Sequence, residues 1–124
     1  MTKLLLIAIL LFGFHSKSIL PIVVINSVNK DIETFARVDC SRFDDSFEKS
    51  EVKKKQIIGK GRINNLLTEL ENLKEQNRKN GTDTRATITI KYPDRTETIC
   101  ADRFSIYRNG TCYEITDNLK KLIW

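Results

Sequence analysis

The sequence contains a single histidine, which limits the acid–base chemistry available to the protein. His15 lies in an apolar N-terminal region that is predicted below to be removed. A serine or cysteine nucleophile needs an imidazole that accepts and returns a proton near neutral pH. Zinc sites in secreted enzymes also rely on histidine, and the three cysteines show no CxxC spacing. The sequence therefore predicts a non-catalytic protein with no metal site and no cofactor.

Carboxylates are the main remaining candidates for acid–base work. Asp44 and Asp45 are adjacent, and Asp31 and Glu33 lie nearby. Neighbouring residues of an extended chain point to opposite sides, so Asp44 and Asp45 do not form an acid–base pair by themselves. A retaining glycosidase needs two carboxyl groups about 5–5.5 Å apart in a cleft, for which a domain of this size offers little room. A carboxylate-based hydrolase that works without histidine is therefore an alternative to the preferred interpretation.

The three cysteines, Cys40, Cys100 and Cys112, allow at most one disulfide within the chain. Strand alternation places Cys100 and Cys112 on one face of a sheet. A tight turn at Ala101-Asp102 would separate them by roughly 13 Å along the strands, and a disulfide tolerates Cα separations only below about 7 Å. Alternation also places Cys40 on the inward face, so it pairs cleanly with neither. The pairing stays open, and we expect the cysteine left over to be a buried thiol.

Residues 1–18 have the pattern of a secretory signal peptide. A short positive start is followed by an apolar run over residues 4–14, and Ser16 and Ser18 occupy the −3 and −1 positions of a cut before Ile19. The alternative is an uncleaved membrane anchor, because residues 4–25 nearly match the roughly 20 residues that span a bilayer. A lysine near the centre of a span costs about 2.5–3.5 kcal/mol, and Lys17 would occupy that place. We therefore expect cleavage, and a chain that is secreted or located in the periplasm or cell envelope.

Net charge argues against nucleic acid as a partner. The chain has a formal net charge of +5, and residues 1–18 contribute two lysines and no acid, so their removal lowers the charge to +3. A modest basic excess on an exported chain is not the footprint of a nucleic-acid-binding protein. We expect membrane contact only through an uncleaved N-terminal segment.

The length of 124 residues fits one domain. We interpret residues 19–32 as an N-terminal extension or linker and residues 33–124 as a single α+β domain. Polar and apolar residues alternate over 33–43, which predicts a half-buried strand, and a second strand is expected over 52–58 with Lys53-Lys54-Lys55 at a solvated edge.

The C-terminal half carries the clearest elements. An apolar stripe over residues 61–79 predicts an amphipathic helix that stops at Asn80-Gly81. Four strands follow over 85–92, 95–101, 103–108 and 111–116, the last two joined at Asn109-Gly110. A short helix over 118–124 would begin after Asp117 as its N-cap. The sequence thus predicts a two-layer sandwich in which one main amphipathic helix packs on a mostly antiparallel sheet with a four-stranded C-terminal meander.

The sheet face away from the helix is the predicted binding surface. It is rich in threonine and mildly basic, and its candidate binding residues are Arg85, Lys91, Arg103 and Tyr107. Arginine and tyrosine are enriched at protein interfaces. We also consider a glycan at the Asn-Gly-Thr sequons of Asn80 and Asn109.

These observations favour a small exported binding or inhibitory module that acts through a sheet face or a loop. Its partner would be a protein or an anionic polymer. The alternatives are an envelope structural protein anchored in the membrane and the hydrolase considered above. The oligomeric state stays open.

Overall fold

The computed structural model describes residues 19–77 and 82–124. The predicted signal peptide, residues 1–18, lies outside the described residues, and so does Asn80 of the first sequon.

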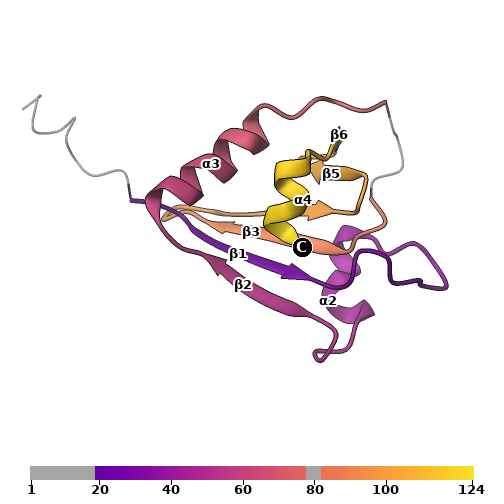
Figure 1. Cartoon of the computed structure of the whole chain (residues 1–124). Coiled ribbons are helices and arrows are strands. Elements are labelled where there is room, and N and C mark those ends of the chain that lie inside the picture. Colours follow the sequence, from indigo (N-terminus) through magenta and orange to yellow (C-terminus); the bar gives the residue numbers. More distant parts are fainter. Residues whose placement is uncertain (1–18, 78–81) are drawn as a thin grey trace, which may run out of the picture.

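Six antiparallel strands form one sheet, in the spatial order β2-β1-β3-β4-β5-β6 (Figure 1). The strands are β1 (Ile22–Ser27), β2 (Lys53–Ile57), β3 (Ala86–Lys91), β4 (Thr96–Ala101), β5 (Ser105–Arg108) and β6 (Thr111–Glu114). The last four are neighbours both in sequence and in the sheet, as expected for a meander. Together with the helices they make the mixed α+β class that the sequence predicts.

Two helices lie on the same side of the sheet, α3 (Lys60–Glu71) and α4 (Asp117–Ile123) (Figure 1). Alternate strand positions and one face of each helix meet in one apolar cluster, because strand side chains repeat every two residues and helix side chains every three or four. The fully or nearly buried members of this core are Val23, Ile25, Ile57, Ile63, Leu66, Leu70, Ala86, Ile88, Ile90, Ile99, Ala101, Ile106, Leu119 and Ile123.

The β5–β6 hairpin follows the prediction closely. Asn109 and Gly110 have φ values of 51° and 78°, as a type I′ turn requires at both central positions. The register places Ile106 opposite Tyr113, as expected. Asn109, the second sequon asparagine, is exposed at the tip of this hairpin.

The β4–β5 connection differs from the tight turn predicted at Ala101-Asp102. Ala101 pairs with Ile106, and the Asp102 N–H donates to the Ser105 carbonyl at 3.0 Å, so the turn spans residues 102–105. The turn is therefore shifted by two residues, with Arg103 and Phe104 at its centre, and the Asp102 side chain stabilises it by accepting the N–H groups of Phe104 and Ser105, each at 2.8 Å. In the resulting register Tyr107 lies between Cys100 and Cys112, which are therefore two strands apart.

The segment 19–32, expected as an extension or linker, contains a central strand. β1 pairs with β2 on one side and with β3 on the other. Val23 and Ile25 are fully buried opposite Ile90 and Ile88. Residues 22–25 are all apolar and directly follow the apolar N-terminal region, so the sequence pattern of this strand merged with that of residues 4–14.

Residues 33–43 do not form the predicted strand. Most of the segment is irregular, and it ends in a 3-10 turn η1 (Cys40–Arg42) and the single helical turn α2 (Phe43–Ser46). Of the positions expected to face inward, Val38 is buried, whereas Ala36 is exposed and Cys40 is half-buried. Cys40 forms a disulfide with Cys100 at a Cα–Cα distance of 5.6 Å. Cys112 is the buried free thiol.

Helix α3 ends at Glu71 instead of continuing to residue 79. The next residues run along the edge of β6, where the Gln76 N–H donates to the Cys112 carbonyl and the Glu114 N–H donates to the Lys74 carbonyl, both at 2.8 Å. Pairing with a sheet edge thus replaces helical bonds. At the start of α4 the N-cap is Thr116, one residue before the predicted Asp117, because its Oγ1 accepts the Leu119 N–H at 3.1 Å.

Candidate functional site

A cleft of about 490 Å³ lies at one end of the sheet, between the segment after β1 and the β4–β5 turn. Residues 30–34 form one wall, and Asp102, Arg103 and Phe104 form the other. Asp83 and Arg85, just before β3, also line it. Functional sites often lie where the fold brings irregular segments from distant parts of the chain together. This cleft is therefore the first candidate site.

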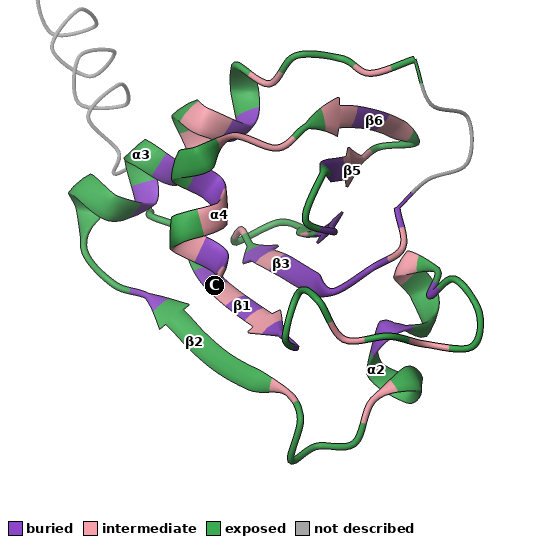
Figure 2. Ribbon diagram, turned by 45° about the vertical axis from the view of Figure 1, so that its right-hand side comes forward, coloured by how far each residue is buried: buried purple, intermediate pink, exposed green. Residues whose placement is uncertain are grey.

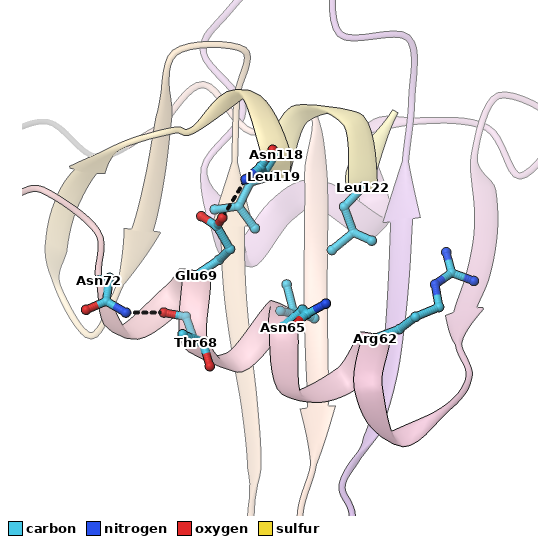
Figure 3. Close-up of a pocket in the computed structure, with 9 residues that line it drawn as sticks. Arg62, Asn65, Thr68, Glu69, Asn72, Asn118, Leu119 and Leu122 are labelled. Carbon is cyan, nitrogen blue, oxygen red and sulfur yellow. Dashed lines mark hydrogen bonds between the residues drawn. The ribbon is translucent and has the colours of Figure 1, made fainter.

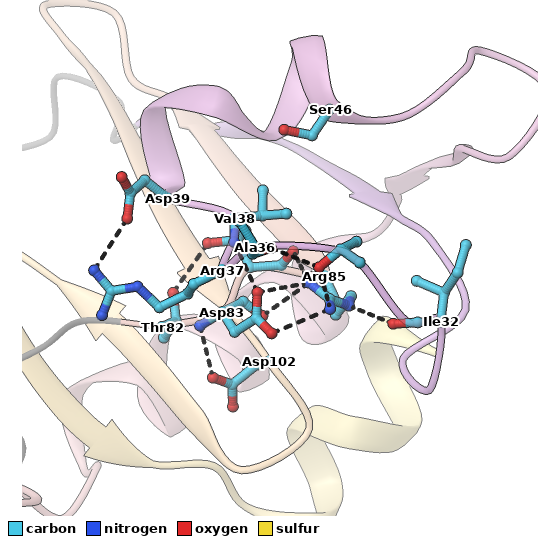
Figure 4. A network of polar contacts seen from close by, with 12 residues as sticks. Ile32, Ala36, Arg37, Val38, Asp39, Ser46, Thr82, Asp83, Arg85 and Asp102 are labelled. Atoms are coloured by element: carbon cyan, nitrogen blue, oxygen red, sulfur yellow. Dashed lines mark hydrogen bonds and ion pairs between the residues drawn. The ribbon is translucent and has the colours of Figure 1, made fainter.

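Arg85, which lines the cleft, is the centre of a network of polar contacts (Figure 4). The residue is only 6% exposed, and every nitrogen of its guanidinium group donates a hydrogen bond. Two of these bonds run to the two carboxylate oxygens of Asp83, at 2.9 and 3.1 Å. Arg85 Nε donates to the Ile32 carbonyl at 3.1 Å, and Nη2 donates to Thr34 Oγ1 at 3.3 Å. A bidentate, charge-assisted arrangement of this kind fixes geometry as well as adding stability.

Asp83 binds the chain at Val38, on the C-terminal side of the segment that Arg85 holds at Ile32 and Thr34. Its Oδ1 accepts the Val38 N–H at 2.8 Å, and the Thr84 N–H donates to the Val38 carbonyl at 2.8 Å. Two residues further on, the disulfide of Cys40 joins the segment to β4. Residues 33–37, called here the 33–37 loop, are therefore held at both ends.

The tip of the 33–37 loop carries an aromatic side chain in solvent. Phe35 is fully exposed, although Thr34 Oγ1 donates to the Ala36 carbonyl at 2.7 Å across it. Across the cleft Phe104 is 58% exposed, with the Arg103 guanidinium 4.7 Å from its ring centroid. Single exposed apolar residues are common, but two exposed aromatic rings at one end of a small domain are a feature that interfaces share.

The carboxylates of the cleft are engaged in structural bonds. Asp102 accepts four hydrogen bonds, from the N–H groups of Asp83, Phe104 and Ser105 and from the Ser105 hydroxyl. Asp83 is paired with Arg85, and Asp31 is paired with Arg103 at 3.0 Å. Three of the four acids that line the cleft thus already serve as acceptors that hold its walls.

The four predicted binding residues do not share one exposed surface. Arg85 is buried beneath the 33–37 loop, and Arg103 lies on the cleft wall. Lys91 is exposed at the far end of β3, opposite Ile22. Tyr107 is half-buried between Cys100 and Cys112. Sequence reasoning did not identify Phe35 as a candidate, because the alternation over 33–43 resembles a strand. The local signal was an aromatic residue at a position that this alternation assigns to the outer face.

A second hollow, of about 530 Å³, lies between α3 and α4 (Figure 3). Glu69 joins the two helices across it, because its carboxylate accepts the Thr116 hydroxyl at 3.1 Å and the Asn118 amide at 2.8 Å. Its other lining side chains are Arg62, Asn65, Leu66, Thr68, Asn72, Leu119 and Leu122. This hollow is the seam of the helix pair, and Glu69 stabilises it.

Comparisons with protein families, curated proteins and solved structures gave no match for this chain. Within residues 19–77 and 82–124, no helix is long and apolar enough to span a bilayer. Over the same residues, no group of three or more His, Cys, Asp and Glu side chains is arranged to hold a metal ion.

Proposed function

We propose that this protein is a small exported binding module without catalytic activity, which contacts a protein partner through the 33–37 loop. It would be a two-layer α+β sandwich with α3 as its main helix. The observation that carries the proposal is the full exposure of Phe35 at the tip of a loop that is fixed at both ends.

A fixed loop favours binding because little conformational freedom is left to lose on association. Arg85, Asp83 and the Cys40–Cys100 disulfide hold the 33–37 loop before any partner arrives. Aromatic and arginine side chains dominate the binding energy of protein interfaces. Phe35 would be the central anchor, with Arg103 and Phe104 on the facing wall of the cleft as secondary contacts. The proposal assigns no contact to Lys91 or Tyr107.

The engaged carboxylates favour binding over hydrolysis. A glycosidase needs one carboxyl group to donate a proton and a second to act as nucleophile or base. Asp102 uses its oxygens to accept four hydrogen bonds, and Asp83 neutralises a buried arginine. These roles compete with proton transfer, and the described residues contain no histidine to take its place.

A disulfide is compatible with an extracellular location, because such bonds persist in oxidising compartments. Export would follow cleavage of residues 1–18, and the membrane would play no part in binding.

Site-specific photo-crosslinking tests the proposed contact. A benzophenone side chain replaces Phe35 in the full chain, and a matched probe replaces Ile58, which is also exposed but lies after β2. In the native extracellular medium or envelope extract, we expect a product of defined mass at position 35 and none at position 58.

Competition then measures the contribution of the ring. Unlabelled wild-type protein and the Ile58→Ala variant should suppress the product equally, whereas Phe35→Ala should need at least about tenfold more protein. Equal competition by Phe35→Ala and wild type would show that the loop is not the contact. A crosslinked product of the same mass and equal yield at positions 35 and 58 would also show that the loop is not the contact.

A further inference from the structure

The two edges of the sheet differ in how they are closed. At the β6 edge, Lys74 and Gln76 pair with Glu114 and Cys112 through their backbones. At the other edge, β2 pairs with β1, and nothing among the described residues pairs with its outer side. An edge strand of this kind presents a row of backbone donors and acceptors to which another extended chain can add.

A groove of about 800 Å³ runs beside this open edge. Its floor is apolar: Val28 and Ile123 are almost fully buried, and Trp124 is half-buried at the end of α4. Trp124 Nε1 donates to the Val28 carbonyl at 2.9 Å, which fixes the indole ring in place. The groove therefore has a preformed aromatic wall.

Lysines surround the groove and line both faces of the edge strand. Lys53 and Lys55 lie opposite Ser27 and Ile25, so they project to the helix side of the sheet, where the groove is. Lys54, opposite Asn26, projects to the other side. All three are exposed, as the colouring of β2 in Figure 2 shows. Lys30 also lines the groove, and Glu51 is its only acidic side chain within the described residues.

We propose that β2 binds an acidic, extended polypeptide segment as a seventh strand of the sheet. The backbone of the segment would pair with the outer side of β2. Its acidic side chains would alternate along the segment and lie directly opposite Lys53 and Lys55, where opposite charges stabilise a cross-strand pair. These side chains would lie on the helix side of the sheet, at the groove beside Trp124. This surface is distinct from the 33–37 loop and does not depend on the function proposed for it.

Charge decides which chains can bind. Lysines on an edge strand discourage association of identical copies, because antiparallel pairing of two β2 strands would bring like charges together. An acidic segment, in contrast, would be attracted by the same lysines. Repulsion alone does not require an apolar groove beside the strand, and the half-buried Trp124 ring, which packs against the main core, supplies apolar surface for the side chains of a bound segment.

Tryptophan fluorescence reports on the groove directly, because Trp124 is the only tryptophan of the chain. The probe is an acetylated and amidated octapeptide of alternating Glu and Thr, titrated into the full chain at low salt. We expect a saturable change in Trp124 emission, together with amide chemical-shift changes over residues 53–57. Affinity should fall as the salt concentration rises, since exposed charges are screened.

Two lysine variants with equal charge change separate the groove from general electrostatics. Lys53→Thr/Lys55→Thr should weaken binding at least about tenfold, whereas Lys60→Thr/Lys91→Thr should stay within twofold of wild type. Phe35→Ala should bind as wild type does.

Two further ligands separate strand addition from simple charge attraction. The same octapeptide with alternate backbone nitrogens methylated should not bind, because it cannot pair with β2. A sulfated polysaccharide should bind more weakly than the octapeptide. The proposal is overturned if the methylated peptide binds equally well, if the polysaccharide is the preferred ligand, if both lysine variants lose affinity equally, or if the octapeptide does not bind.

Discussion

The two faces of the sheet are covered by different means. On one face α3 and α4 contribute leucine and isoleucine side chains to a continuous apolar core with the strands. The other face carries Cys100, whose disulfide to Cys40 ties the largely irregular segment 29–46, which includes η1 and α2, to the sheet. There Val38 and Phe43 are buried outside the main core, and Arg85 and Asp83 bind the backbone of the segment.

This difference shows how regular and irregular coverings are stabilised. A helix satisfies most of its own backbone groups, so it needs only an apolar stripe to dock on a sheet. An irregular segment leaves backbone groups without local partners, and buried ones must be satisfied by side chains from elsewhere. The irregular side therefore depends on a few specific connectors, and it is also the side that presents the 33–37 loop.

The largest expected effect comes from the helix-covered face. Ile88 is fully buried in the middle of β3, and Ile88→Ala should lower the free energy of unfolding by about 4 kcal/mol, since it removes buried methylene groups and leaves a cavity. Urea denaturation followed by circular dichroism measures this loss. Thr89→Ala, on the other face of the same strand, should cost less than about 1 kcal/mol. Similar losses for both variants would contradict the assignment of the main core.

Removal of the disulfide should have the next largest effect. Cys40 and Cys100 are 60 residues apart, so Cys40→Ser/Cys100→Ser frees a long loop in the unfolded chain and should cost about 3 kcal/mol. In this variant, amide hydrogen exchange should become faster over residues 29–46, whereas exchange in β3 should change much less. Cys112→Ala, which removes the thiol that forms no disulfide, serves as the control and should leave exchange in segment 29–46 unchanged. Uniformly faster exchange over the whole sheet would argue against a separately held segment.

Arg85 tests the polar connectors alone, with the smallest expected effect. Arg85→Met keeps most of the side-chain volume but removes the bonds to Asp83, Ile32 and Thr34, and should cost about 2 kcal/mol. Asp83 is 45% exposed and can recover water, which keeps the loss below that of a fully buried pair. Arg95→Met, which removes an exposed pair with Asp94 and a contact with the Tyr92 ring, should cost less than about 1 kcal/mol. If the two arginine variants behave alike in thermal unfolding, Arg85 does not hold the loop.

Local patterns predicted the elements whose stability is local. Asn109-Gly110 favours positive φ at two successive positions, and the hairpin register follows from that turn. The stripe of Ile63, Leu66 and Leu70 predicts α3 and its buried face. β2 with its lysine edge was also predicted.

Predictions failed where a distant partner decided the conformation. Residues 33–43 alternate like a strand, but no neighbouring strand accepts them, and Arg85 takes up the Ile32 carbonyl instead. Asp83 and Arg85 are close in sequence, but the loop residues that Arg85 binds lie about fifty residues earlier. No local sequence pattern links Arg85 to that loop.

The sequence by itself determined the α+β class, the hairpin, the amphipathic α3 and the lack of histidine after residue 15, because these depend on residue type and on periodicity over a few turns. The tertiary structure alone decided that β1 is a central strand, that Cys40 pairs with Cys100, and that Phe35 stands in solvent above a buried arginine. The physical reason is that backbone groups and charges are satisfied by whichever partner the folded chain brings near, and that partner can be fifty or more residues away.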